Sequence, residues 1–263
     1  MIKSFNMATM PQRINTAIKT IDSVYDQADV IRLYLNNFDS VPEQFKRDKI
    51  EILQGEDLRS TGKVYSALNK DEYYFCIDDD LEYPHNYAKL LINKLNFYDD
   101  KIVVTLHGKI LPATSQRNFF RRPIRHYACT RTVARDVWVN LIGNGVSLWN
   151  TNNFRVDYNT WKYSYMDDLN VSIDMQRQKI PGLVMAHKST YLKYNHPAGT
   201  TLHEQYSKSD KTQTEIVNTV NPWKLWNGVH QEMPLRPDHR DNRGHPNVSR
   251  LRRRNKQTRG TRS

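Results

Sequence analysis

Three consecutive carboxylates, Asp78, Asp79 and Asp80, directly follow the apolar run 73–77. Carboxylates this close repel one another, and the repulsion grows where a strand leaves the protein interior. A divalent cation would relieve it, and hard oxygen ligands suit Mg²⁺ or Mn²⁺. Such a cation can bridge a diphosphate and stabilise the charge that develops on a leaving group. The alternative is a solvated acidic turn ahead of a helix beginning near Pro84, because helix N-termini favour acids.

A second acidic pair, Asp167 and Asp168, lies about ninety residues later, just before another helical stretch. A carboxylate here can take the proton of an acceptor hydroxyl if it lies within hydrogen-bond reach. The alternative is an N-cap with a first-turn acid, which stabilises a helix by about 1 kcal/mol. His187 ends the apolar run 182–186. If that run joins the same sheet, His187 can complete a metal site with Asp78 and Asp80; otherwise it is a structural or surface histidine.

Small and cationic residues follow the other apolar runs. Loops of this kind approach phosphates and nucleobases closely, whereas the alternative is ordinary turn chemistry with solvated charges. The candidate nucleotide-binding residues of this type are Thr9, Pro11, Arg13, Arg59 and Lys63.

The elements that must position these residues alternate along the first half of the chain. The apolar patterns predict strands at 2–8, 30–35, 49–53, 72–77, 101–106 and 182–186, and helices at 14–25, 63–69, 88–98 and 169–180. This order predicts an α/β fold with a parallel sheet and crossover helices, in which a ligand binds beyond the carboxyl ends of the strands. Residues 109–165 have no clear period, and periodicity disappears after about 230. We therefore expect one domain, 1–230, and a basic flexible tail, 231–263.

Taken together, these residues resemble the glycosyltransferase-A (GT-A) fold and its large inverting family 2 over residues 4–187. The resemblance rests on ATMPQR (8–13) as a nucleotide-binding turn, LYLNN (33–37) as a strand whose polar end meets the base, Gly62–Lys63 as a helix start at the nucleotide pocket, IDDDLEYP (77–84) as the metal-binding Asp-x-Asp element, and LHG (106–108).

The resemblance implies a Rossmann-like, mostly parallel sheet and an inverting transfer from a nucleotide-sugar, expected to be linked to uridine diphosphate. Asn36 and Asp79 join the residues expected to bind this donor. The diphosphate would lie on Mn²⁺ or Mg²⁺ held by Asp80, with Asp78 and His187. Asp168 would be the catalytic base, and Asp167 stands beside it where the family usually has Glu.

Charge is distributed unevenly along the chain, which carries a net charge of +11. Residues 236–263 contain ten Lys and Arg against two Asp, residues 109–135 contain seven Lys and Arg and no acid, and the remainder is therefore mildly acidic at −4. Cations interleaved with aromatic residues suit phosphate backbones and exposed bases. The candidate acceptor-binding residues are Arg117, Arg121, Arg122, Arg125, Arg252, Arg253 and Arg254.

Some bacteriophages glycosylate hydroxymethylated cytosines in their own DNA, and this chain looks like a GT-A counterpart of those enzymes. Double-stranded DNA is accordingly the expected acceptor, with the target base flipped out of the duplex. The alternatives are a cell-surface polysaccharide or lipid-linked glycan, a protein acceptor, attraction of the tail to anionic lipid, and binding of donor phosphate by the arginine segment. A nucleic-acid-binding protein without catalysis is the alternative of another class.

Compartment is predicted from cysteine usage and hydropathy. Two cysteines, Cys76 and Cys129, favour a reducing environment over a disulfide framework. No run approaches the roughly 18 apolar residues of a membrane span, and the N-terminus lacks the apolar region of a signal peptide. We therefore expect a cytoplasmic protein, in the host cytoplasm if it is viral.

Overall fold

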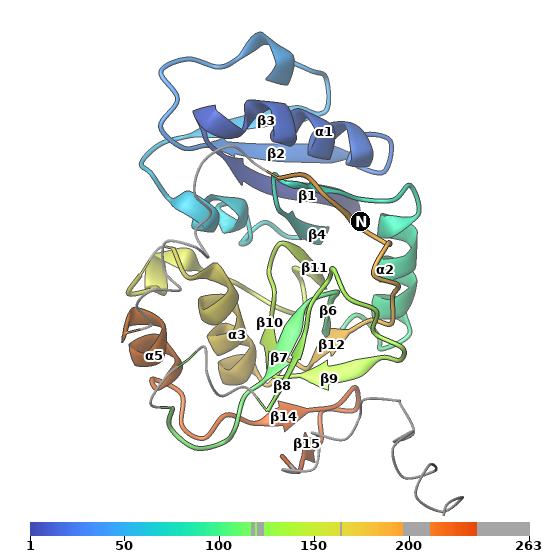
Figure 1. Ribbon diagram of the computed structural model, residues 1–263, viewed down its shortest axis with the longest axis vertical. Helices are drawn as coiled ribbons and strands as arrows, with labels where there is room; N and C mark the ends of the chain where they lie inside the picture. The colour runs from blue at the N-terminus through green and yellow to red at the C-terminus, as the bar shows by residue number, and fades with distance from the viewer. Residues whose placement is uncertain (117–118, 120–123, 164, 197–210, 236–263) are drawn as a thin grey trace, which may run out of the picture.

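A mixed eight-stranded sheet is the centre of the fold. The computed structural model describes residues 1–116, 119, 124–163, 165–196 and 211–235. Within them the strand order is β3–β2–β1–β4–β11–β6–β12–β9 (Figure 1). The strands are β1 (Ile2–Thr9), β2 (Val30–Leu35), β3 (Ile50–Gln54), β4 (Glu72–Ile77), β6 (Val103–Thr105), β9 (Val137–Val139), β11 (Val146–Asn150) and β12 (Gly182–Val184).

Six of these strands run in the same direction. β3, β2, β1 and β4 pair in parallel, and β12 pairs in parallel with β6. β11 is antiparallel to both β4 and β6, and β9 is antiparallel to β12. The carboxyl ends of β1, β2, β4, β6 and β12 therefore meet one edge, together with the amino end of β11. The predicted α/β class with a mostly parallel sheet is confirmed, whereas the GT-A type of fold stays a prediction.

Helices cover both faces of the sheet. The helices are α1 (Ile14–Val24), α2 (Tyr87–Asn96), α3 (Asp167–Gln178) and α5 (Lys211–Val217), with short 3₁₀ turns η1 (Pro11–Arg13), η2 (Glu43–Phe45), η3 (Arg59–Val64) and η4 (Tyr158–Thr160). In β4, Phe75 and Ile77 pack into the core that contains α1 and α2, whereas Tyr74 and Cys76 pack into the core that contains α3. This alternation is the period-two pattern of a strand buried on both faces.

Smaller sheets surround this centre. One consists of β10 (Leu141–Ile142), β7 (Gly108–Ile110) and β8 (Arg125–Tyr127), the second of β13 (Lys193–Tyr194) and β5 (Leu81–Glu82), and the third of β14 (Leu225–Trp226) and β15 (Glu232–Met233). β15 falls on the tail side of the predicted boundary at residue 230. The division into 1–230 and 231–263 stays a prediction.

One predicted helix is wrong, and one segment described as irregular contains strands. The helix predicted at 63–69 is instead η3 followed by a turn. Gly62 lies against the ring of Tyr34, where a Cβ would be 2.6 Å from a ring carbon, and a glycine at this position also lowers the propensity for an α-helix. The segment 109–165, which has no clear period, contains β7 to β11. The sequence pattern does not indicate β11, because all five of its residues are buried, the polar Ser147 and Asn150 included, so no exposed polar face alternates with a buried apolar one.

Candidate functional site

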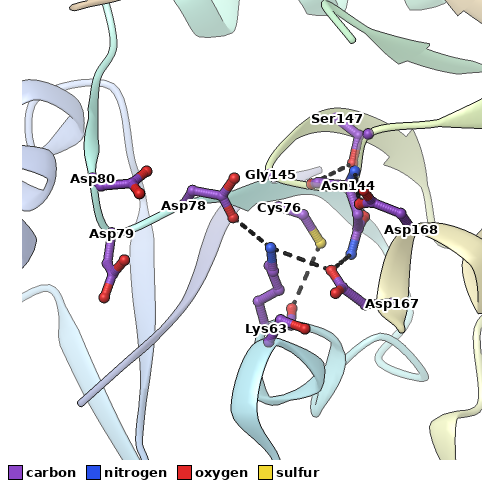
Figure 2. A network of polar contacts seen from close by, with 12 residues as sticks. Lys63, Cys76, Asp78, Asp79, Asp80, Asn144, Gly145, Ser147, Asp167 and Asp168 are labelled. Carbon is purple, nitrogen blue, oxygen red and sulfur yellow. Dashed lines mark hydrogen bonds and ion pairs between the residues drawn. The ribbon is translucent and has the colours of Figure 1, made fainter. Parts of the chain in front are cut away.

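The carboxyl ends of three parallel strands bring the first group of candidate residues together. Thr9 ends β1, Asn36 follows β2 and Asp78 follows β4. Thr9 donates a 2.8 Å hydrogen bond to Asp79, and Arg13 donates another of 2.8 Å to the second carboxylate oxygen of the same residue. Asp79 is buried and, in Figure 2, points away from Asp78. Its contacts fix Arg13 at the edge of the sheet.

A cavity of about 290 Å³ opens at this edge. Six of the seven predicted donor-binding residues line it, namely Thr9, Arg13, Asn36, Arg59, Lys63 and Asp79, and Asp78 lines it as well. The seventh, Pro11, is exposed in η1 and is not among the lining residues. Its fixed backbone angle suits the first position of that turn. Six residues predicted from the sequence therefore share one concave surface; that they bind a donor stays a prediction.

Asn36 contributes one paired donor and one unpaired acceptor to the cavity. It is 2 % exposed, and its Nδ2 donates a 3.0 Å bond to the carbonyl oxygen of Arg59. Its Oδ1 is buried and accepts no hydrogen bond from the described residues. A buried acceptor without a donor is unfavourable, so Oδ1 is suited to a ligand N–H. Arg59 adopts a left-handed backbone conformation with φ of 49° and places its guanidinium 4.9 Å from the centre of the Tyr165 ring.

Lys63 joins the two acidic motifs. Its ammonium lies 2.5 Å from Asp78 Oδ1 and 3.2 Å from Asp167 Oδ2 (Figure 2). The side chain of Lys63 is only 6 % exposed. Burial would lower the pKa of Lys63, but Asp167 and Asp78 outweigh it and raise that pKa well above the usual value. Lys63 was predicted to bind donor phosphate; its direct partners are these two carboxylates.

Asn144, between β10 and β11, holds both members of the second acidic pair. Its backbone N–H donates a 2.6 Å bond to Asp168, and its side-chain amide donates a 3.0 Å bond to Asp167. Ser147 orients that amide by donating a 3.0 Å bond to its oxygen. Both carboxylates are thus fixed relative to the loop that enters β11, as Figure 2 shows.

The surroundings of Asp167 and Asp168 shift the pKa values of the two carboxyl groups in opposite directions. Burial opposes ionisation of Asp167, but Lys63, Ser60 and Asn144 outweigh it and lower the pKa of Asp167. Desolvation by the surrounding protein and the neighbouring Asp167 raise the pKa of Asp168 to about 7, although Asp168 remains exposed to solvent. A carboxylate of this kind is accessible and titrates where a general base is effective.

The acidic run itself carries excess negative charge. Burial raises the pKa of Asp80 to about 7, and the nearby Asp78 and Asp79 contribute to that rise. Its nearest cation is Arg13, at 3.7 Å. Among the described residues, Arg13 and Lys63 form ion pairs with members of this group, and Lys109 interacts electrostatically with Asp168. Five carboxylates against three cations leave a net charge of about −2 when all are ionised, which favours binding of a cation.

His187 has the hydrogen-bonding state of a metal ligand. Its Nδ1 lies 2.7 Å from the carbonyl oxygen of Met185, which can only accept, so Nδ1 carries the proton. Its Nε2 is buried and has no partner among the described residues. A backbone carbonyl commonly holds a metal-binding histidine in this way. Two carboxylates and such an imidazole form a donor set that Mn²⁺ accepts.

The three predicted metal ligands are not gathered at one point. β12 is in the same sheet as β4, as expected, but β11 and β6 lie between them, which separates the two strands by about 14 Å. The chain after His187 returns towards the acidic run, since the Asn195 N–H donates to the Asp80 carbonyl at 2.8 Å. Across the described ranges, no three His, Cys, Asp or Glu residues form a group that could hold a metal. The metal site stays a prediction.

Most of the predicted acceptor-binding arginines lie outside the described residues, namely Arg117, Arg121, Arg122, Arg252, Arg253 and Arg254. Arg125 is half-buried in β8, and its Nη2 is buried without a hydrogen-bond partner among the described residues. Phe119 is buried in the core next to α3 and α5, so its ring is not available for stacking on a base. Phe119 therefore contributes no exposed ring to the predicted nucleic-acid surface, and Phe120 of the same segment lies outside the described residues. That surface stays a prediction.

Sequence reasoning missed the loop 143–145, which the structure brings into contact with both acidic motifs. A Cβ on Gly145 would lie 1.7 Å from a carboxylate oxygen of Asp78, so only glycine fits there. Tyr83 donates to the Gly145 carbonyl at 2.6 Å and accepts from the Asp78 N–H at 2.9 Å. The Gly-Asn-Gly sequence was the available indication, because it marks a tight turn.

The comparisons with known proteins add no relative. No protein-family model matches the chain, and the search of curated proteins finds no match either. In the part of the chain that the structure describes, no helix is both long and apolar enough to cross a bilayer.

Proposed function

We propose that this chain is a metal-dependent inverting glycosyltransferase of the GT-A type, which transfers a sugar from a nucleotide-sugar to a hydroxyl acceptor. The observation that carries the proposal is the cavity at the strand ends. It combines cations with the unpaired Oδ1 of Asn36, and Lys63 of its lining is ion-paired with Asp167, the neighbour of Asp168, whose pKa is raised to about 7. Perturbed groups in a cleft are typical of active sites.

The cavity fits the nucleotide half of a donor. Its volume of about 290 Å³ is at the lower end for small-molecule sites. The free acceptor on Asn36 suits the imide N–H of a uracil ring, which supports uridine diphosphate as the carrier. Arg13 and Arg59 line the same cavity and can hydrogen-bond phosphate oxygens.

Asp168 is the proposed base. Its ionised carboxylate takes the proton of the acceptor hydroxyl, whose oxygen forms a bond to the anomeric carbon. The bond from that carbon to the diphosphate oxygen breaks, and the electron pair leaves with the nucleotide. Because attack and departure occur on opposite faces, the configuration inverts. Asn144 orients Asp168 through its N–H, and Lys63 keeps Asp167 ionised beside it.

A divalent cation fits the excess negative charge and the carboxylate oxygens of the acidic run, and His187 would have to approach that run to add a nitrogen donor. Asp80 would hold the cation, with Asp78 and His187. When bound, it would stabilise charge on the diphosphate leaving group. Arg13, which is ion-paired with Asp79, would contribute to the same stabilisation.

Double-stranded DNA that contains hydroxymethylcytosine is the proposed acceptor. The proposal rests on the charge of the segment 109–135 and of the tail 236–263, where lysine and arginine far exceed acids. A cell-surface polysaccharide or lipid-linked glycan is the second candidate acceptor, because the basic segments would also attract anionic lipid. A cytoplasmic location follows from the DNA acceptor.

The reaction is tested by incubating the protein with Mn²⁺ and a panel of nucleotide-sugars and measuring release of the nucleotide. Asp168→Asn is expected to lower sugar transfer by roughly 10²- to 10⁴-fold while donor binding, measured by calorimetry, is retained. Asp29→Asn is the matched control, because Asp29 is exposed and ion-paired with Lys3. A protein that neither binds nor cleaves any donor would refute the proposal and favour non-catalytic binding of nucleic acid.

The acceptor is tested by comparing DNA with and without hydroxymethylcytosine, using mass spectrometry of the nucleosides. We expect sugar on the modified base alone, and duplex binding that weakens by about 0.9 log units per log unit of salt for each phosphate contact. Transfer to a polyprenyl-linked glycan instead, with no DNA product, would replace DNA by the second candidate.

A further inference from the structure

Lys63 occupies an unusual position for a lysine. Its ammonium is buried between Asp78, which follows β4, and Asp167, which begins α3. Tyr74 and Cys76 direct polar atoms at the carbonyl oxygen of Lys63, at 2.9 Å and 3.6 Å, so the backbone of this residue is fixed as well. Lysine is rarely buried unless it is paired.

We propose that Lys63 is an internal cation that competes with the divalent metal for Asp78. Its ammonium neutralises Asp78 when no metal is present, and metal binding requires Asp78 to exchange this partner for the ion. The inference rests on the proposed function, because it takes from there a cation site at the acidic run.

Both oxygens of the Asp78 carboxylate are engaged. Oδ1 accepts from Lys63 at 2.5 Å, and Oδ2 packs against Gly145, where a Cβ would come within 1.7 Å. The Asp78 carboxylate thus points to Lys63, as Figure 2 shows. In this orientation Asp78 belongs to no group of three His, Cys, Asp or Glu residues that could hold a metal among the described residues.

Electrostatic interactions favour the exchange of Lys63 for a metal ion as the partner of Asp78. Lys63 has a second partner, Asp167, at 3.2 Å, so its ammonium stays paired when Asp78 leaves. Asp78 keeps 42 % of its side-chain surface exposed and can rotate towards solvent. A doubly charged ion within about 5 Å of several carboxylates gains more Coulomb energy than a single ammonium does.

A double-mutant cycle tests the competition, with Mn²⁺ alone as the probe and the electron paramagnetic resonance of free Mn²⁺ as the readout. The four proteins are wild type, Lys63→Met, Asp78→Asn and the double variant. Removing Lys63 is expected to tighten Mn²⁺ binding at least about tenfold when Asp78 is present. In the Asp78→Asn background the same change is expected to alter binding less than about threefold.

Lys94→Met is the matched control, because Lys94 forms an ion pair of 2.7 Å with Asp136 and is 30 % exposed. It is expected to leave Mn²⁺ binding unchanged. Lys63→Arg keeps the charge and is expected to bind Mn²⁺ within about threefold of wild type. If circular dichroism shows that Lys63→Met does not fold, Lys63→Gln takes its place in the cycle.

Three results would overturn the inference. Equal tightening in the wild-type and Asp78→Asn backgrounds would mean that Lys63 acts only as a distant charge. No tightening would mean that Lys63 is a permanent structural cation. No Mn²⁺ binding by any variant would mean that the acidic run holds no cation with which Lys63 could compete. Since no sugar donor is used, a positive cycle together with an absence of sugar transfer would refute the proposed function and leave this inference standing.

Discussion

Asp80→Asn should make the metal-free protein more stable at pH 8, although it removes a residue of the candidate site. Burial, together with Asp78 and Asp79, raises the pKa of Asp80 to about 7. A carboxyl group with a raised pKa binds more protons in the folded state than in the unfolded state between about pH 4 and 7. The folded state is therefore progressively destabilised as the pH rises through that window. Asparagine has nearly the same shape and carries no charge.

The magnitude follows from the two pKa values. The difference between about 7 in the folded protein and the usual 3.8 corresponds to at most about 4 kcal/mol at pH 8. The side chain is 15 % exposed, and Arg13 at 3.7 Å offsets part of the repulsion. We therefore expect a gain in the free energy of unfolding of about 2 to 4 kcal/mol at pH 8, and almost none at pH 4.

Urea unfolding in EDTA at pH 4 and pH 8 measures this effect. Glu82→Gln is the matched control, because a hydrogen bond from Lys193 lowers the pKa of Glu82. Ionised Glu82 therefore stabilises the folded state, whereas ionised Asp80 destabilises it. The stabilisation by Glu82 is present above its unfolded pKa and is lost as the pH falls. At this partly exposed pair we expect a loss of at most about 1 kcal/mol at pH 8. If Asp80→Asn is no more stable than wild type at pH 8, the reasoning about uncompensated charge is refuted.

Two further predictions concern the base and the core. The value of kcat/KM for sugar transfer should rise as the pH increases through about 7, because Asp168 must lose its proton to act; a profile that is flat from about pH 5.5 to 8.5 would exclude Asp168 as the base. Arg32→Met should lower the free energy of unfolding by roughly 3 to 5 kcal/mol, because it leaves Glu72, which is 3 % exposed, without the bidentate partner now at 2.8 and 2.9 Å. Urea unfolding measures that loss, and a change below about 1 kcal/mol would contradict it.

The sequence by itself determined most of the elements, because their patterns are local. The strands around Phe5, Leu33 and Phe75 and the helix faces of α1, α2 and α3 follow from hydrophobic periods within about a dozen residues. The order of these elements also placed Thr9, Asn36 and Asp78 at one edge, since parallel strands joined by crossovers end on the same side of a sheet. Seven of the eleven residues that line the cavity could therefore be named without coordinates.

Tertiary structure decided what these residues touch. The partners of Lys63 are 15 and 104 positions away, and only the packing of η3 beneath β4 and α3 selects Asp78 and Asp167 for it. Asn144 reaches Asp168 because β11 inserts antiparallel between β4 and β6, an arrangement with no local pattern. Periodicity reports which face of an element is buried, whereas ion pairs and pKa values depend on distances of a few ångströms between elements far apart in the chain. That dependence is the reason why the chemistry of the acidic run required the folded structure.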